Sequence, residues 1–258
     1  MKLNQRPAWR RLAPTQRVAM LVAIIATIDV VLLVRLWSAE PLVSDVRLSW
    51  FALIPMFAFV EWRVIHIQFR AEASSFSLLE IPLVLGLLYA SPRDLIVAAM
   101  IGLTLGLALA RRQSLLKVAF NVANLGFYAA AAWILVEALA PGANLERGMW
   151  LVVFLATAVG TTLSVTSILA AITLTEGAPG WLQATRLILF AVAMSAANTA
   201  LGLVAAILLP SEALGIALLL VPAAMVLLAF QMFASERAQR ERVEFLYRSS
   251  RLLDAEET

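Results

Sequence analysis

Long runs of apolar residues constrain this chain more than any other feature. A helix that crosses the roughly 30 Å hydrocarbon core of a bilayer needs about 20 mostly apolar residues, because each residue rises about 1.5 Å. Eight stretches are candidates: 18–37, 48–60 with an extension to 69, 79–90, 94–110, 117–139, 149–174, 183–209 and 213–234. The stretch at 79–90 reaches only about 18 Å, so we expect a half-span buried among its neighbours. The sequence thus predicts an all-α, polytopic membrane helix bundle of about eight spans.

The composition fits a bilayer and excludes several kinds of site. Hydrophobic residues make up 62% of the chain and charged residues 14%, against about a quarter in soluble domains. There is no cysteine and one histidine, His66, so thiolate, iron–sulfur, cysteine-zinc and histidine-pair sites are excluded. A net charge of +3 gives little reason to expect a nucleic-acid partner. We therefore expect no catalytic residues, no metal, no cofactor and no enzymatic activity in this chain.

The Lys and Arg residues predict an orientation. If the N-terminus is cytoplasmic, sixteen of the 20 basic residues fall on that side, and the other four are Arg35, Arg47, Arg93 and Arg147. Positive residues stay on the cytoplasmic side of short loops, so the pattern places both termini on the cytoplasmic side of the membrane. We expect a basic N-terminus at 1–17, which together with the first span forms an uncleaved signal anchor, and a bundle at 18–234.

The segment between the second and third spans has a different pattern. Residues 63–69 alternate polar and apolar side chains, which indicates an extended segment at the interface. Ser77 and Glu80 have the spacing of a capping box, and Pro82 is tolerated only in a first helical turn, so a helix should begin between Ser77 and Pro82. Residues 177–180 (GAPG) predict a turn.

The last 24 residues, 235–258, are charged and contain apolar residues at a seven-residue spacing. Val243, Leu246 and Leu253 occupy the core positions of a weak coiled coil. One interpretation is a cytoplasmic signalling helix that dimerises and leads from the last span to a downstream domain, before which this chain is cut. The other is an amphipathic tail on the membrane surface.

Polar residues within the spans are the candidate ligand-binding residues. Each ionisable group at depth costs about 2.5–3.5 kcal/mol on insertion scales and needs an explanation inside the bundle. Asp29 lies deep in the first span, Asn121 and Asn124 share a helix face that can line one cavity, and Asn198 lies in the seventh span. Glu80 begins the short span. For Asp29 the functional interpretation is a carboxylate that responds to a proton or a ligand, and the alternatives are a hydrogen bond to another helix or a neutral, protonated acid. For the asparagines the alternative is hydrogen bonding between helices, and for Glu80 it is helix capping.

A charged cluster is predicted at the cytoplasmic interface after the second span. It comprises Glu61, His66, Arg70 and Glu72. A structural ion-pair network and a binding site both remain open, and His66 is the one group that titrates near neutral pH without a perturbed environment.

Two resemblances to known families add expectations. The runs RAEASSFSLLEIPLVLGLLYASP at 70–92, RRQSLLKVAFN at 111–121 and ERVEFLYRSSRLL at 241–253 resemble the N-terminal membrane region of actinobacterial cyclic-di-GMP signalling proteins, which continue into GAF, GGDEF and EAL domains. The resemblance implies a sensory or anchoring module that detects a small or lipophilic ligand. A longer parent protein would turn over cyclic-di-GMP, although these 258 residues contain neither a GGDEF nor an EAL signature.

The second resemblance is more distant and concerns fold. The segments FSLLEIP at 76–82 and ASP at 90–92, with Gly102 and Gly106 in the next helix, are similar to the substrate-binding (S) subunits of energy-coupling-factor vitamin transporters and to related vitamin-uptake sensor domains. It implies a six-helix core of spans 2–7 and a vitamin-like ligand. The sequence thus leaves a membrane sensor or anchor and a transporter subunit as alternatives.

Overall fold

The computed structural model describes residues 12–43, 46–62, 65–69, 72–76, 78–110, 113–140 and 147–210, and five residues between 221 and 228. Within these ranges the chain forms helices and one β-hairpin, in the order α1 (Pro14–Arg35), α2 (Trp50–Trp62), β1 (Ile65–Phe69), β2 (Glu72–Phe76), α3 (Glu80–Tyr89), α4 (Pro92–Ala110), α5 (Leu115–Leu139), α6 (Arg147–Thr175) and α7 (Trp181–Leu208). The predicted helical bundle is confirmed, with the hairpin as its one non-helical element in the described part.

Four of these helices are long and apolar enough to cross a membrane: α1, α5, Gly148–Thr175 of α6, and α7. The protein is therefore a multi-pass membrane protein. The short third helix is confirmed, since α3 has ten residues. The eighth stretch, 213–234, lies largely outside the described residues, so the number of eight spans stays a prediction.

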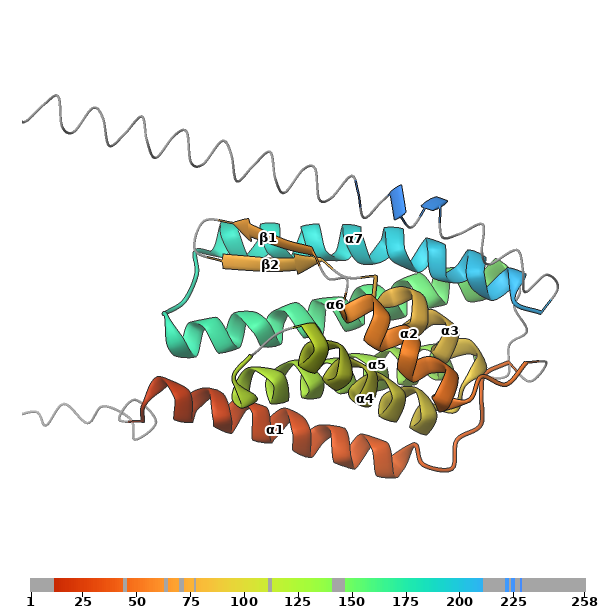
Figure 1. The fold of residues 1–258 in the computed structure, drawn as a ribbon, viewed down its shortest axis with the longest axis horizontal. Helices are drawn as coiled ribbons and strands as arrows, with labels where there is room; N and C mark the ends of the chain where they lie inside the picture. Colours follow the sequence, from red (N-terminus) through yellow and green to blue (C-terminus); the bar gives the residue numbers. More distant parts are fainter. Residues whose placement is uncertain are drawn as a thin grey trace, which may run out of the picture.

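The segment after α2 corrects one boundary and confirms one pattern. The extension of the second span to residue 69 is wrong, because α2 ends at Trp62 and Ile65–Phe69 forms strand β1. Strand β1 pairs with β2 antiparallel, with Ile65 opposite Phe76 and Phe69 opposite Glu72. The alternating residues 63–69 therefore predicted extended backbone correctly for the residues that are described. In Figure 1 the hairpin lies toward the end of the bundle where α1 begins and α6 ends.

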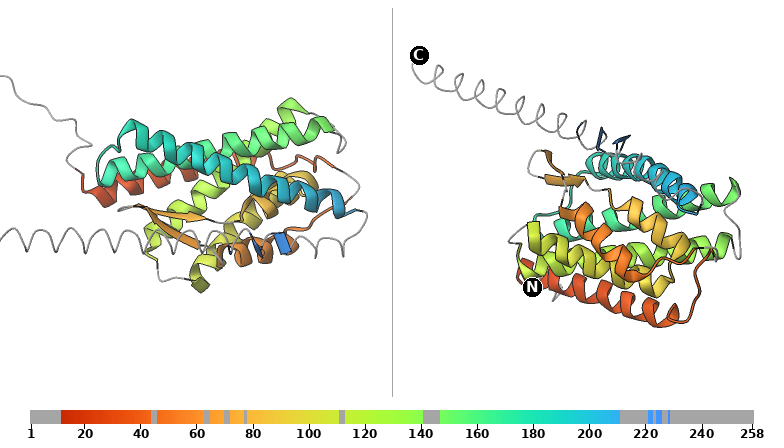
Figure 2. Two further views of the ribbon diagram at one scale, coloured as in Figure 1. Left: turned by 90° about the horizontal axis from the view of Figure 1, so that it is seen from above. Right: turned by 45° about the vertical axis from the view of Figure 1, so that its right-hand side comes forward.

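Helix α5 runs through the middle of the bundle and contacts α1, α3, α4 and α6. Helix α2 packs on α4, and α3 packs mainly on α7. Helices α1 and α7 lie on opposite sides of the molecule in Figure 1 and in the right-hand view of Figure 2. Helix α1 is thus a peripheral helix, whereas α3 and α5 are interior.

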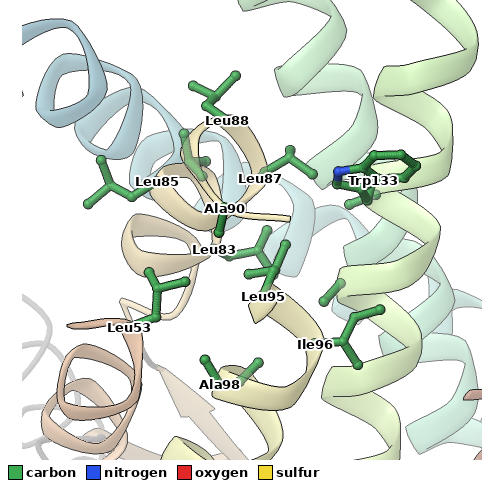
Figure 3. Close-up of a cluster of buried hydrophobic side chains, with 14 of the residues drawn as sticks. Leu53, Leu83, Leu85, Leu87, Leu88, Ala90, Leu95, Ile96, Ala98 and Trp133 are labelled. Carbon is green, nitrogen blue, oxygen red and sulfur yellow. The ribbon is translucent and has the colours of Figure 1, made fainter. Parts of the chain in front are cut away.

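The apolar core lies where α2, α3, α4 and α5 meet (Figure 3). Leu83 and Leu87 of α3 point toward Leu95 of α4 and Trp133 of α5, and all four side chains are fully buried. Glycines permit the closest of these packings: a Cβ on Gly102 of α4 would come within 2.7 Å of a backbone carbonyl oxygen of α2. Gly102 thus permits the close approach of α4 to α2.

Two contacts show which helix ends lie together at each end of the bundle. The Arg17 guanidinium at the start of α1 donates to the carbonyl oxygen of Leu174 near the end of α6, at 3.5 Å. At the other end, the Arg93 guanidinium at the start of α4 lies 5.2 Å from the ring centre of Trp37, just after α1. Arg17 and Arg93 are therefore at opposite ends, as the predicted cytoplasmic and outer assignments require.

The loop between α1 and α2 closes the outer end of α3. The backbone N–H groups of Val43 and Leu48 donate to the carbonyl oxygens of Leu88 and Tyr89, each at 2.9 Å. These carbonyls belong to the last turn of α3, where no residue of the helix itself can supply a donor. The loop thus satisfies groups that would otherwise be unpaired inside the bundle.

Candidate functional site

Helix α3 begins at Glu80, which lies inside the bundle. The predicted start is confirmed, with Pro82 in the first turn, but the N-cap residue is Leu79 and no side chain caps it. Ser77 lies outside the described residues. The Glu80 carboxyl group accepts its own backbone N–H and also a hydrogen bond from Asn198 Nδ2 of α7, at 3.0 Å. Two of the predicted ligand-binding residues, 118 positions apart in the chain, are therefore in direct contact.

A chain of hydroxyl groups continues from Glu80 into the bundle. The Ser195 hydroxyl of α7 hydrogen-bonds the Glu80 carboxyl and lies 2.8 Å from Thr161 Oγ1 of α6, which is 3.2 Å from the Tyr128 hydroxyl of α5. The four residues that connect to Glu80 in this way, Tyr128, Thr161, Ser195 and Asn198, are all buried. Ser195 and Asn198 are each 1% exposed. We call Glu80, Tyr128, Thr161, Ser195 and Asn198 the polar centre. It brings together residues from four helices.

The polar centre lies away from the ends of α3, α5 and α7. Helices α3 and α7 end close together at the predicted outer side, where the Tyr89 hydroxyl donates to the carbonyl oxygen of Ala206 at 2.7 Å. Glu80, Tyr128 and Asn198 each precede the end of their helix by nine to eleven residues. At 1.5 Å per residue this places them about 15 Å below that end, half of a 30 Å hydrocarbon core.

The charge of the polar centre is set by one carboxyl group. The two ion pairs among the described residues, Arg47 with Glu40 and Arg93 with Asp94, are both at the predicted outer end, and neither involves Glu80. The described residues also contain no group of three carboxylate or imidazole side chains that could hold a metal ion. Glu80 is therefore the one residue of the polar centre that can carry a charge near neutral pH.

The other two asparagines lie outside this centre. Asn124 is buried and its Nδ2 donates to Ser164 Oγ of α6 at 2.7 Å, one turn from the Tyr128–Thr161 contact. Asn121 is only partly buried. Asn124 therefore makes a hydrogen bond between α5 and α6.

Asp29 is buried in the interface of α1, at 4% exposure. Both carboxyl oxygens lie without a hydrogen-bond partner among the described groups. They belong to a part of the bundle separate from the polar centre, because α1 contacts α4, α5 and α6 but does not pack on α7 or α3.

The predicted interfacial cluster is described only in part. Glu61 is buried at the end of α2, where its Cβ faces Gly106 of α4, so it lies within the bundle rather than at an exposed surface. His66 and Glu72 belong to β1 and β2. Arg70 lies outside the described residues, as do Val243, Leu246 and Leu253 of the predicted signalling helix.

No protein-family model, curated protein or solved structure matches this chain. The positions and contacts of its residues are therefore what defines the candidate site. Sequence reasoning missed Tyr128, Thr161 and Ser195. The spacing of small polar residues is a signal for Ser195 and Thr161. Ser195 and Asn198 share one face of α7, and Thr161 lies four residues after the buried Thr157 of α6.

Proposed function

We propose that this protein is a sensory or anchoring module of a bacterial inner membrane that binds a small or lipophilic ligand at the polar centre. The observation that carries the proposal is the convergence of Glu80, Ser195 and Asn198 near mid-membrane depth, backed by two further hydroxyl groups. Buried polar groups in a membrane are expensive and are concentrated at functional sites. A centre built by four helices can change their relative positions when it is occupied.

The proposed output leaves the membrane through the last span. Residues 235–258 would form a dimerising cytoplasmic helix, with Val243, Leu246 and Leu253 in its seam, and pass the change to a downstream domain. The resemblance to cyclic-di-GMP signalling proteins suggests that this domain turns over cyclic-di-GMP in a longer parent protein. The chain itself would then have no enzymatic activity, and its partners would be the lipid bilayer and a second copy of itself.

Native mass spectrometry tests ligand binding without requiring the ligand's identity. Wild-type protein, released gently from native membranes, should carry a non-lipid adduct of one defined mass. Glu80→Gln and Asn198→Leu should lose it. Tyr89→Phe is the matched control, because it removes another hydrogen bond between α3 and α7, at the outer end, and should keep the adduct. Absence of the adduct from wild type, or equal retention by all variants, would refute the proposal.

The alternative function is the substrate-binding subunit of a vitamin-type transporter. It is favoured by one feature, a short helix that begins near the bilayer midplane beside a polar group, which is the arrangement of many transporter sites. The two functions differ in their partners. A transporter subunit should copurify with an energising ATPase module, whereas a sensor should be purified as a homodimer.

A further inference from the structure

Helix α7 has one buried face and one exposed face. The buried face includes Ser195 and Asn198 of the polar centre, and it packs mainly on α3 and α6. The exposed face lies on the opposite side of the helix, because its residues are rotated by about 180° from the buried ones at 3.6 residues per turn. The residues of this exposed face are Leu189, Ala193, Ala197, Ala200, Val204 and Ile207.

The middle of this exposed face carries small side chains. Ala193, Ala197 and Ala200, which we call the alanine face, are all exposed. At the same depth the neighbouring α6 exposes the larger Leu155 and Val159, at 49% and 38%. Small side chains let the backbones of two membrane helices approach closely and are enriched where such helices meet. The alanine face is therefore shaped for another helix.

The chain that follows α7 supplies that helix. Helix α7 ends at Leu208, at the predicted outer side, and the next apolar stretch begins at 213. Residues 213–234 contain no charged side chain and are long enough to cross a bilayer. The connection of four residues, 209–212, reaches at most roughly 17 Å, less than two helix diameters. Helices joined by so short a connection are antiparallel neighbours.

We propose that residues 213–234 dock on the alanine face of α7 as an antiparallel neighbour. Helices α3 and α6 already occupy the buried side of α7, so the exposed side is open to the next span. Helix α7 would then contact the polar centre with one side and the span that leads to the cytoplasmic tail with the other. A ligand that moves Asn198 would thereby move the last span. This consequence rests on the ligand binding proposed above, whereas the docking itself does not.

The described residues of the last stretch indicate which of its sides faces α7. The five residues described between 221 and 228 are helical. Val221, Met225 and Leu228 are spaced by four and three residues, so they share one side of the helix, and they are 56–65% exposed. We expect this side to face lipid. The opposite side of a helix through these positions includes residues 223 and 226, and we expect it to face α7.

Cysteine cross-linking can test the docking, because the chain contains no native cysteine. Counted in equal rises from the connection at 209–212, Ala197 lies at about the depth of residue 224. Ala197→Cys is combined in turn with a second cysteine at each position from 221 to 228, in the full 258-residue chain in native membranes. On mild oxidation, disulfide formation should be strongest for Ala223→Cys and weakest for Val221→Cys, Met225→Cys and Leu228→Cys. Peptide mass spectrometry identifies links within one chain, and a non-reducing gel identifies links between two chains.

Two controls make the result decisive. Leu155→Cys, in the neighbouring α6, is exposed at a similar depth and should give no link with Ala223→Cys. Ala197→Cys alone should run as a single chain on the gel. The proposal is overturned if Ala197→Cys links to no position from 221 to 228, if Leu155→Cys links as strongly, or if Ala197→Cys alone joins two chains, which would place a second copy on this face. Absence of the ligand adduct would refute the proposed function but would leave these links unchanged.

Discussion

Replacing Gly160 by alanine tests whether the polar centre is packed as tightly as its geometry indicates. Gly160 of α6 lies directly against the ring of Tyr128 in α5, where a Cβ would overlap Cδ2 and Cε2. The ring cannot easily move away, since Tyr128 is buried and its hydroxyl lies 3.2 Å from Thr161 Oγ1. The added methyl group must therefore separate α5 from α6 or break the hydroxyl contact.

The magnitude follows from two opposing effects. Overpacking of a well-packed interior costs about 1–3 kcal/mol, while alanine in place of glycine inside a helix contributes up to about 1 kcal/mol of stability. Gly148→Ala, in the same helix, is the matched control, because a Cβ there meets no atom within 4 Å. Both variants gain stability from the higher helix propensity of alanine, so most of that gain cancels when the two are compared. We expect Gly160→Ala to be less stable than Gly148→Ala by about 1–3 kcal/mol.

Unfolding in mixed micelles with increasing dodecyl sulfate, followed by circular dichroism, gives the free energies. Tyr128→Leu combined with Gly160→Ala should recover part of the loss, since the flat ring that meets the methyl group is gone. If Gly160→Ala and Gly148→Ala unfold at the same denaturant concentration, the close contact between α5 and α6 is refuted.

Three further predictions use the same preparations. Gly102→Ala should lower the free energy of unfolding by about 3 kcal/mol in the micelle assay, because its Cβ would meet the carbonyl oxygen of Ile54, a backbone atom, at 2.7 Å. Tyr89→Phe should cost about 0.5–1.5 kcal/mol there through loss of the 2.7 Å hydrogen bond to Ala206. A hydrophobic carbodiimide, which attacks protonated carboxyl groups, should add one reagent mass at Asp29 in membranes, more slowly as pH rises, and peptide mass spectrometry of Asp29→Asn should show no such adduct.

The helices could be predicted from the sequence because their signal is local. A run of apolar residues long enough to cross a bilayer is visible without any knowledge of its neighbours, and the ends of α5 and α7 fall within two residues of the predicted ones. The short α3 was recognised for the same reason, as was the extended backbone at Ile65–Phe69. The boundary of α2 was overextended because Ile65, Ile67 and Phe69 of β1 continue the apolar character of α2.

The polar centre could not be assembled from the sequence because its contacts are distant in the chain. Glu80 and Asn198 were each recognised as unusual, but nothing local shows that one donates to the other across 118 residues. Ser195 and Thr161 were missed since hydroxyl side chains are common in membrane helices, where many hydrogen-bond the carbonyl one turn earlier, as Thr162 does with Ala158. The spacing of Ser195 and Thr161 is a signal, but the sequence does not show that these two hydroxyl groups contact each other.

The length of α3 explains why a polar centre forms at this depth. Ten helical residues cover about 15 Å, so α3 alone reaches only half of a 30 Å hydrocarbon core. Before α3, strand β1 pairs its backbone groups with β2. The outer end of α3 is closed by the loop donors at Val43 and Leu48. The free backbone N–H groups at the start of α3 need acceptors. The Glu80 carboxyl accepts its own backbone N–H, and Asn198 Nδ2 donates to that carboxyl in turn.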